Sequence, residues 1–270
     1  MGTKPKSSII TLTTDFGDRD YFVGVMKGIM LGINPKVKIV DITHNVSPFQ
    51  VMEVAFLIAN FYSYFPKGTI HLAVVDPGVG SSRRPVIAKT KDYFFVAPDN
   101  GVLSYIYKKE KNIKVYEIAN DDYFLKPLSQ TFHGRDIFAP VAAHISKGVS
   151  CNKIGKRIND FVSIPIKEPA IRKNIIVGEM LYIDRFGNLI TNISKEDFES
   201  SLSQSKRKIF KIKINDFRIR SLSASYSSAK WKNLSAIWGS HGYLEIFSKE
   251  GNAGERFRIK PGEKISIAFL

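Results

Sequence analysis

Short apolar segments of β type alternate with longer helical segments over the first 160 residues, and this order restricts the possible folds more than any other feature of the chain. The predicted strands are 8–13, 37–42, 69–75, 94–97 and 115–118, and the predicted helices are 21–33, 48–65 and 137–145. The strand at 69–75 is apolar at most positions, which is typical of a strand covered on both faces. A βαβα order of this kind predicts an α/β domain with a largely parallel sheet.

The pattern changes after about residue 160. The segment 163–174 carries two prolines and little helical periodicity, which indicates a linker. Beyond it, short β-type runs follow one another with almost no helix signal, as in a small all-β domain of the barrel-like or sandwich kind. We therefore predict an N-terminal α/β domain over 1–162 and a barrel-like C-terminal β domain over 175–270.

The charge of the chain is strongly unbalanced, with 40 basic against 25 acidic residues and a net charge of +15. Such an excess suits a polyanion partner such as RNA. Most of it, however, is scattered lysine, denser only at Lys206–Lys208, Lys211 and Lys213, and no arginine-and-aromatic motif accompanies it. We therefore expect a charged surface and no nucleic-acid partner. One cysteine, no apolar stretch near the ~20 residues of a membrane span and no signal-peptide segment predict a cytoplasmic protein without membrane contact.

Polar side chains stand where predicted strands end or a predicted helix begins. Asp15 follows the first strand, Asp76 follows the third, and His133 lies just ahead of the helix at 137–145, each with a glycine nearby. Ligands of open parallel sheets bind beyond the carboxyl ends of the strands, so the three turns favour a site on one rim. Taken singly, each residue could instead cap a helix or fill a turn.

Several familiar kinds of site lack their remaining parts. Asp15-Phe16-Gly17 spells the magnesium motif of kinases, but their glycine-rich loop, strand lysine and catalytic loop are missing. The chain contains neither a dinucleotide fingerprint nor a P-loop. The spacing of Asp15, Asp18 and Asp20 differs from that of a calcium loop, and the five histidines form no HxH or HxxxH pair. We expect no metal and no cofactor.

The C-terminal part carries a second polar constellation. Asp184, Phe186 and Asn188 stand two residues apart in DRFGNLITNI. A carboxylate, a ring and a carboxamide in this spacing suit a ligand with a flat ring and an amide-readable edge, such as adenine. A glycine-centred β-turn is the structural alternative.

In their order along the chain, seven segments resemble the S-adenosylmethionine hydroxide adenosyltransferase family, which is related to the fluorinase and chlorinase. The segments are TTDFGDRDYFVGVMKG, DITHNVSPF, VVDPGVGSSRRPV, PDNGVLS, FHGRDIFAP, DRFGNLITNI and GSHGYLEIF with GNA, and they cover nearly the whole chain. The resemblance implies an α/β domain followed by a β-barrel-like domain. It also implies a homotrimer whose active sites lie between the N-terminal domain of one subunit and the C-terminal domain of the next.

The implied reaction is hydrolysis of S-adenosyl-L-methionine, in which water attacks the 5′ carbon of the ribose and gives adenosine and L-methionine. The resemblance places the catalytic set on Asp76, Arg83 and His133, and the ribose-binding carboxylate on Asp15. The other substrate-binding residues would be Phe49, Phe132, Asp184, Phe186, Asn188, Ser240, Glu245 and Ala253. The glycines after Asp76 would let the chain turn so that Arg83 returns beside it, while Arg84 stays in solvent.

The residue at position 76 also separates water from halide as the nucleophile. A charged carboxylate about 4 Å from chloride would cost on the order of 4 kcal/mol at an effective dielectric of ~20, and the halogenating relatives have a different residue here. We therefore expect hydrolysis, whether Asp76 acts as a base or only positions water. The alternatives are a halide-dependent adenosyl transferase of the chlorinase kind and a basic nucleoside- or RNA-binding module without catalysis.

Overall fold

The computed structural model describes residues 8–205, 207 and 209–270. Lys206 and Lys208 of the basic run, and the first seven residues, lie outside this range. The chain divides into two compact units, with unit 1 ending at Ile166 and unit 2 beginning at Lys167.

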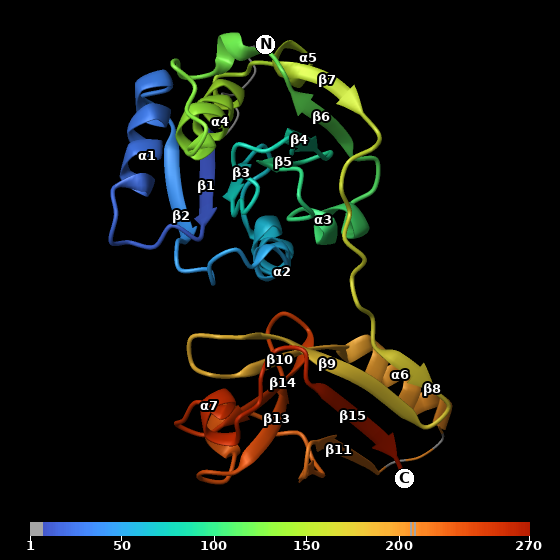
Figure 1. The fold of residues 1–270 in the computed structure, drawn as a ribbon. Coiled ribbons are helices and arrows are strands. Elements are labelled where there is room, and N and C mark those ends of the chain that lie inside the picture. The colour runs from blue at the N-terminus through green and yellow to red at the C-terminus, as the bar shows by residue number, and fades with distance from the viewer. Residues whose placement is uncertain (1–7, 206, 208) are drawn as a thin grey trace. The chain divides into compact units, whose positions relative to one another are not determined.

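Unit 1 contains a seven-stranded sheet in the order β2-β1-β3-β5-β4-β6-β7 (Figure 1). Its strands are β1 (Ile9–Thr14), β2 (Lys38–Thr43), β3 (Ile70–Val74), β4 (Pro85–Lys89), β5 (Phe94–Pro98), β6 (Lys114–Ile118) and β7 (Gly155–Ile158). The predicted parallel sheet is confirmed for β2, β1, β3 and β5. At the other end, β4, β6 and β7 run antiparallel to their neighbours.

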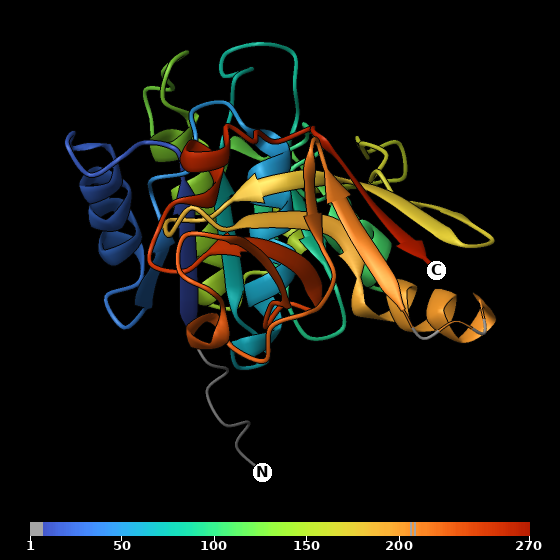
Figure 2. The same cartoon turned by 90° about the horizontal axis from the view of Figure 1, so that it is seen from below.

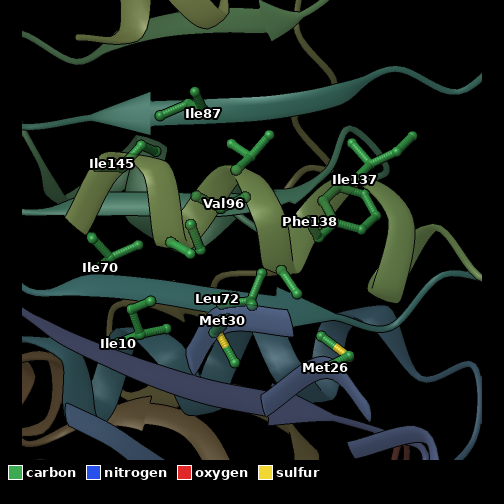
Figure 3. Close-up of a cluster of buried hydrophobic side chains, with 14 of the residues drawn as sticks. Ile10, Met26, Met30, Ile70, Leu72, Ile87, Val96, Ile137, Phe138 and Ile145 are labelled. Carbon is green, nitrogen blue, oxygen red and sulfur yellow. The ribbon is translucent and has the colours of Figure 1, made fainter. Parts of the chain in front are cut away.

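Helices cover both faces of this sheet. They are α1 (Phe22–Ile33), α2 (Val51–Phe61), α3 (Ser104–Lys109), α4 (Ala139–Ser146) and α5 (Cys151–Ile154), with single turns η1 (Tyr62–Tyr64) and η2 (Asp121–Tyr123) and the π-helical turn η3 (Gly134–Phe138). Met26 and Met30 of α1 pack with residues of α4 against Ile10 and Leu72 of the strands (Figure 3). On the opposite face, α2 and α3 pack against alternate strand residues such as Ala73. All five residues of β3 are buried, as expected for a strand covered on both faces.

The predicted helix at 48–65 is shorter in the structure. Phe49 has a positive φ of 67°, so the chain cannot be helical there, and α2 begins at Val51. At its far end the helix tightens into η1. The helix predicted at 21–33 is confirmed within one residue at its start.

Unit 2 is built on an eight-stranded sheet that is antiparallel throughout, in the order β12-β11-β15-β9-β10-β14-β13, with β8 paired to β9. The strands are β8 (Ala170–Arg172), β9 (Ile175–Ile183), β10 (Leu189–Ser194), β11 (Phe210–Ile214), β12 (Phe217–Ile219), β13 (Leu234–Trp238), β14 (Tyr243–Ser248) and β15 (Lys264–Phe269). Strands β12 and β13, at the two ends of that order, contact each other and nearly close the barrel. The predicted barrel-like β domain is confirmed, and β8 lies inside the segment predicted as a linker.

Helical segments occur in unit 2 although the sequence showed almost no helix signal there. They are α6 (Lys195–Ser205), α7 (Ala253–Phe257) and the short turn η4 (Tyr226–Ser228). Helix α6 lies on the outside of the strands, against β9 and β10 (Figure 2). Ser194 and Asp197 exchange hydrogen bonds at its start, with Ser194 Oγ accepting from Asp197 N and Asp197 Oδ2 accepting from Ser194 N. This capping box is a signal from which the helix could have been predicted.

Over the described residues, every helix is too short or too polar to span a lipid bilayer.

Candidate active site

Asp76 and Arg83 form a buried, bidentate ion pair. Arg83 Nε lies 2.9 Å and 2.8 Å from the two carboxylate oxygens of Asp76, and Nη2 lies 2.5 Å from Oδ2. The two side chains are only 5% and 9% exposed. A carboxylate this deep is stabilised by the guanidinium fork, which satisfies both of its oxygens at once. The predicted return of Arg83 to Asp76 is confirmed.

The turn between these two residues depends on glycine. Gly80 has φ of +76°, and a Cβ there would lie 2.4 Å from the carbonyl oxygen of Gln130. A side chain at this position is therefore excluded by both backbone strain and contact. The close approach also packs the turn against the segment that leads to His133.

His133 completes the cluster. Arg83 Nη2 lies 2.6 Å from His133 Nδ1, and because a guanidinium only donates, Nδ1 must accept and carry no proton. Burial, and then the charge of Arg83, lower the pKa of His133, against opposing contributions from Asp76, from Asp136 and from a hydrogen bond with the backbone of Ser129. The imidazole is thus neutral at pH 7 with its proton on Nε2. That nitrogen is buried and has no hydrogen-bond partner of good geometry in the described part of the chain.

Asp136 shapes the backbone around His133. Its fully buried carboxylate accepts from Ser129 N at 2.8 Å and pairs with Arg135 Nε at 2.5 Å. Its own carbonyl accepts from Leu125 N at 2.8 Å. These bonds fix the approach to the π-helical turn that carries His133 at its start. Asp136 was not among the predicted site residues, although FHGRD contains it.

Asp15 and Phe49 meet each other at the end of β1. Asp15 Oδ2 accepts a hydrogen bond from Phe49 N at 3.0 Å. The Phe49 ring is 67% exposed, and its backbone is held in the left-handed region that bulky residues rarely adopt. Strain of this kind at an exposed aromatic residue is typical of a functional site.

Phe132, predicted as an aromatic wall, belongs to a cluster of rings. It makes edge-to-face contacts with Phe16 and Phe22 at centroid distances of 5.9 Å and 5.2 Å. The Arg135 guanidinium lies 5.4 Å from the centre of its ring. The cluster joins the segment after β1 to the segment before His133.

The prediction that Arg84 stays in solvent is wrong. Arg84 Nη2 donates to the buried carboxylate of Asp99 at 2.9 Å, and Nη1 pairs with Asp160 at 3.1 Å. Consecutive residues of an extended chain point to opposite sides, so Arg83 faces Asp76 while Arg84 faces these two carboxylates.

In unit 2, Asp184, Phe186 and Asn188 form one tight turn between β9 and β10. Asp184 Oδ1 accepts from Phe186 N at 2.9 Å and from Asn188 N at 2.8 Å, while Oδ2 accepts from Asn188 Nδ2 at 2.9 Å. Gly187 has φ of +82°, so the glycine-centred turn is confirmed. The Phe186 ring is 78% exposed. The turn therefore holds an open aromatic face next to an ordered carboxamide.

The segment from 251 to 254 packs on this turn. The backbone N–H of Ala253 donates to Gly187 O at 3.0 Å, and a Cβ at Gly187 would lie 2.2 Å from Asn252 Cγ. Ala253 itself is fully buried, whereas Ser240 is exposed between β13 and β14. The structure thus joins Ala253 to the Asp184 turn.

Glu245 is a buried carboxylate on β14 with two side-chain partners. Tyr226 OH donates to Oε2 at 2.6 Å, and His241 Nε2 lies 3.0 Å from Oε1. Burial acts to raise the pKa of Glu245, but these hydrogen bonds outweigh it and hold the pKa below its usual value. Burial, the bond to Glu245 and the charge of Asp184 together raise the pKa of Tyr226. Tyr226 therefore holds Glu245 and lies within the field of Asp184. No pattern in its serine-rich segment indicates this role.

Among the described residues, no three His, Cys, Asp or Glu side chains gather as they would to hold a metal ion. The unit 1 cluster can bind and orient a small polar molecule beside an ionised carboxylate and a neutral imidazole. The unit 2 turn can stack against a flat ring.

Family models, curated proteins and solved structures are similar to this chain over most of its length. The model of the S-adenosylmethionine hydroxide adenosyltransferase N-terminal domain matches residues 10–155, and that of the C-terminal domain matches residues 178–266. An (R)-S-adenosyl-L-methionine hydrolase of Methanocaldococcus jannaschii is 34% identical over 97% of this chain and 96% of its own length. A fluorinase of an Actinoplanes species is 29% identical over 72% of this chain and 74% of its own. The crystal structure of an uncharacterized conserved protein from Thermotoga maritima superposes with a TM-score of 0.88, with 35% identity over 96% of this chain and 99% of that one.

Proposed function

The chain belongs to the S-adenosylmethionine hydroxide adenosyltransferase family, and from this premise we propose that it hydrolyses S-adenosyl-L-methionine to adenosine and L-methionine. One observation supports this most directly: an ionised carboxylate, Asp76, is held by Arg83 beside the neutral His133. That arrangement suits a water molecule that must be oriented for attack.

The sulfonium of the substrate is a good leaving group, so the demanding step is the placement of water in line with the C5′–S bond. The new bond joins the water oxygen to C5′, the C5′–S electron pair leaves with methionine, and one water proton is released. Asp76 accepts a hydrogen bond or the proton from that water. Positioning of this kind contributes several kcal/mol to the barrier reduction. Arg83 fixes the Asp76 carboxylate through its bidentate ion pair.

The remaining predicted residues would bind the rest of the substrate. Asp15 takes the ribose hydroxyls, with Phe49 and Phe132 as aromatic walls. The adenine ring stacks on Phe186, and its edge hydrogen-bonds with polar groups of the turn. Asp184, Asn188, Ser240, Glu245 and Ala253 complete the proposed set. Support comes from the exposed Phe186 ring and from the strained, exposed Phe49.

Water is preferred to halide because Asp76 is buried and charged where the nucleophile would stand. Two anions in contact in a site of low exposure repel strongly. In contrast, the water dipole is stabilised by the same carboxylate. We therefore propose hydrolysis over halide transfer.

We further propose a homotrimer in the cytoplasm, with active sites that combine unit 1 of one subunit with unit 2 of the next. The resemblance to the family supports this arrangement, and the residue set is divided between the two units. Light scattering on the purified protein measures the subunit number. Co-expression of Asp76→Ala with Phe186→Asp, each expected to turn over little substrate alone, forms mixed oligomers. These should regain activity if sites are shared between subunits and should not if each subunit is self-contained.

The reaction itself is tested by incubating the purified protein with S-adenosyl-L-methionine in ¹⁸O-water. Mass analysis of adenosine should find the label in the 5′ hydroxyl. Unchanged substrate would overturn the proposal. A parallel incubation with chloride should give adenosine, and 5′-chloro-5′-deoxyadenosine as the main product would favour the halide-dependent alternative.

A further inference from the structure

The order of the strands requires the loop that carries Asp76 and Arg83 to connect two strands that are not neighbours in the sheet. Strand β3 leads into the loop and β4 leaves it, yet β5 lies between them in the sheet. Neighbouring strands are about 4.8 Å apart, so the two ends of the loop are separated by about 10 Å. The loop must therefore cross over the end of β5, and Asp99 and Asn100 follow β5 at that point.

Asn100 holds the incoming end of the loop. Its Nδ2 donates to the carbonyl oxygen of Val75 at 2.9 Å, one residue before Asp76. Its Oδ1 accepts from Val102 N at 3.2 Å, which fixes the orientation of the carboxamide. Val75 is fully buried, so the bond satisfies a carbonyl that water does not reach.

Asp99 holds the outgoing end. Its backbone N–H donates to the carbonyl oxygen of Arg84 at 2.8 Å. Its carboxylate accepts from Arg84 Nη2 at 2.9 Å and from Val162 N at 2.8 Å. The Asp99 side chain is 2% exposed, so its charge depends on Arg84 for compensation. The dipeptide Asp99-Asn100 thus hydrogen-bonds to the residue before Asp76 and to the residue after Arg83.

The backbone hydrogen bonds within the loop are local and do not connect its two ends. Val79 N donates to Asp76 O at 3.2 Å and Ser81 N to Gly78 O at 3.1 Å, which are local turns. Such turns shape the loop, whereas Val75 and Arg84 at its two ends lie beyond the strand pairings with β5, which stop at Leu72 in β3 and begin at Pro85 in β4. The positions of these end residues decide whether the guanidinium of Arg83 reaches both oxygens of Asp76.

We propose that Asp99 and Asn100 are positioning residues that clamp both ends of the loop and hold Asp76 and Arg83 in register. The kinetic part of this proposal rests on the proposed function. Neither residue belongs to the proposed substrate-binding set, so loosening the clamp should misplace the attacking water and lower kcat while KM for S-adenosyl-L-methionine changes little.

Asn100→Asp is the first test, because it keeps the shape and the acceptor but removes the donor to Val75. The chain offers a matched control in Asn120, whose Nδ2 donates to Lys153 O at 3.1 Å and whose Oδ1 accepts from Asp122 N at 3.0 Å. We expect at least a 10-fold loss of kcat in Asn100→Asp with KM within 2-fold, and wild-type values in Asn120→Asp. Unchanged kcat in a folded Asn100→Asp would overturn the proposal.

Arg84→Gln is the second variant and keeps the test open if Asn100→Asp fails to fold. It removes the ion pair to Asp99 from a partly exposed side chain. Its control is Asp160→Asn, which removes only the pair to a carboxylate that is 78% exposed. We expect a loss of about 5-fold in kcat for the first and none for the second. Equal kinetics in the two variants would contradict the clamp.

Hydrogen exchange separates the clamp from the proposed reaction. Peptides covering 76–84 should exchange faster in Asn100→Asp and Arg84→Gln than in their controls, whatever the substrate is. If the wild-type protein shows no turnover but the two variants show this exchange pattern, the proposed reaction is rejected and the clamp is supported. If the wild-type protein turns over substrate but exchange is unchanged in both variants, the clamp is rejected and the reaction is supported.

Discussion

The Asp76–Arg83–His133 cluster and the Asp184 turn use their polar atoms in opposite ways. In unit 1, the acid, the guanidinium and the imidazole bind one another and are nearly removed from solvent. In unit 2, both carboxylate oxygens of Asp184 accept hydrogen bonds from residues of the turn itself, while Phe186 is 78% exposed. The first is a buried network of charged and polar side chains, and the second is a hydrogen-bonded turn that exposes an aromatic side chain to solvent.

This difference indicates a division of work. A buried charge fixed by several bonds is preorganised for a reaction step. An exposed aromatic ring on a rigid turn provides apolar contact area for a ligand, and little conformational entropy is lost when the ligand binds. Changes in the cluster should therefore affect kcat, and changes in the turn should affect KM. The predictions below test this division in order of decreasing effect.

Asp76→Asn should produce the largest effect. The amide keeps the volume but cannot take a proton or hold Arg83 in the same bidentate bond, so we expect kcat to fall by ~10²- to 10⁴-fold, the range typical of acid–base groups. KM for S-adenosyl-L-methionine should change little. Steady-state adenosine formation measures both constants.

The matched control for this variant is Asp121→Asn, which removes a surface pair with Lys126 in which the side chains are 65% and 61% exposed. It should retain wild-type kinetics. If Asp76→Asn keeps kcat within 10-fold of the wild type, the unit 1 cluster does not act on the nucleophile and the comparison fails.

Phe186→Ala should weaken substrate binding without loss of fold. Base–aromatic stacking is worth about 1–3 kcal/mol, so KM should rise by ~5- to 150-fold with a much smaller change in kcat. The ring is exposed, so the melting temperature should stay the same. Ile209→Ala, at a side chain 64% exposed in the same unit, is the control. A fall in kcat at constant KM would assign this ring to catalysis and would contradict the division between a catalytic cluster and a binding turn.

The return of Arg83 to Asp76 was predicted well because local features determine it, whereas the resemblance to the family placed His133 in the same set. The apolar run at 69–75 places Asp76 at a strand end, and glycines that tolerate close backbone approach bring Arg83 back. Arg84 was mispredicted because its partners, Asp99 and Asp160, lie 15 and 76 residues away. The antiparallel pairing of β4 with β5 brings Asp99 opposite Arg84, and no strand was predicted at the position of β4.

The unit 2 site was predicted less completely for the same reason. The Asp184 turn is local, and its residues were identified. Tyr226 reaches Glu245 across 19 residues from a segment without periodicity, so no pattern marked it. Phe49 was expected inside a helix, but it has a positive φ and its N–H donates to Asp15, 34 residues earlier in the chain.

The smallest effect concerns the buried carboxylate of unit 2. The folded pKa of Glu245 lies below its ordinary value of 4.5, so its bonds stabilise the fold above about pH 4.5, and this contribution is lost as the pH falls below that value. Tyr226→Phe removes one donor and should cost about 1 kcal/mol at pH 7 and less in the acid range. Both tryptophans, Trp231 and Trp238, belong to unit 2, so their fluorescence during urea unfolding at pH 7 and at pH 4 reports this unit. Tyr64→Phe, at a side chain 81% exposed in unit 1, should leave both curves unchanged. An equal loss at the two pH values would mean that Tyr226 acts through packing and not through the charge of Glu245.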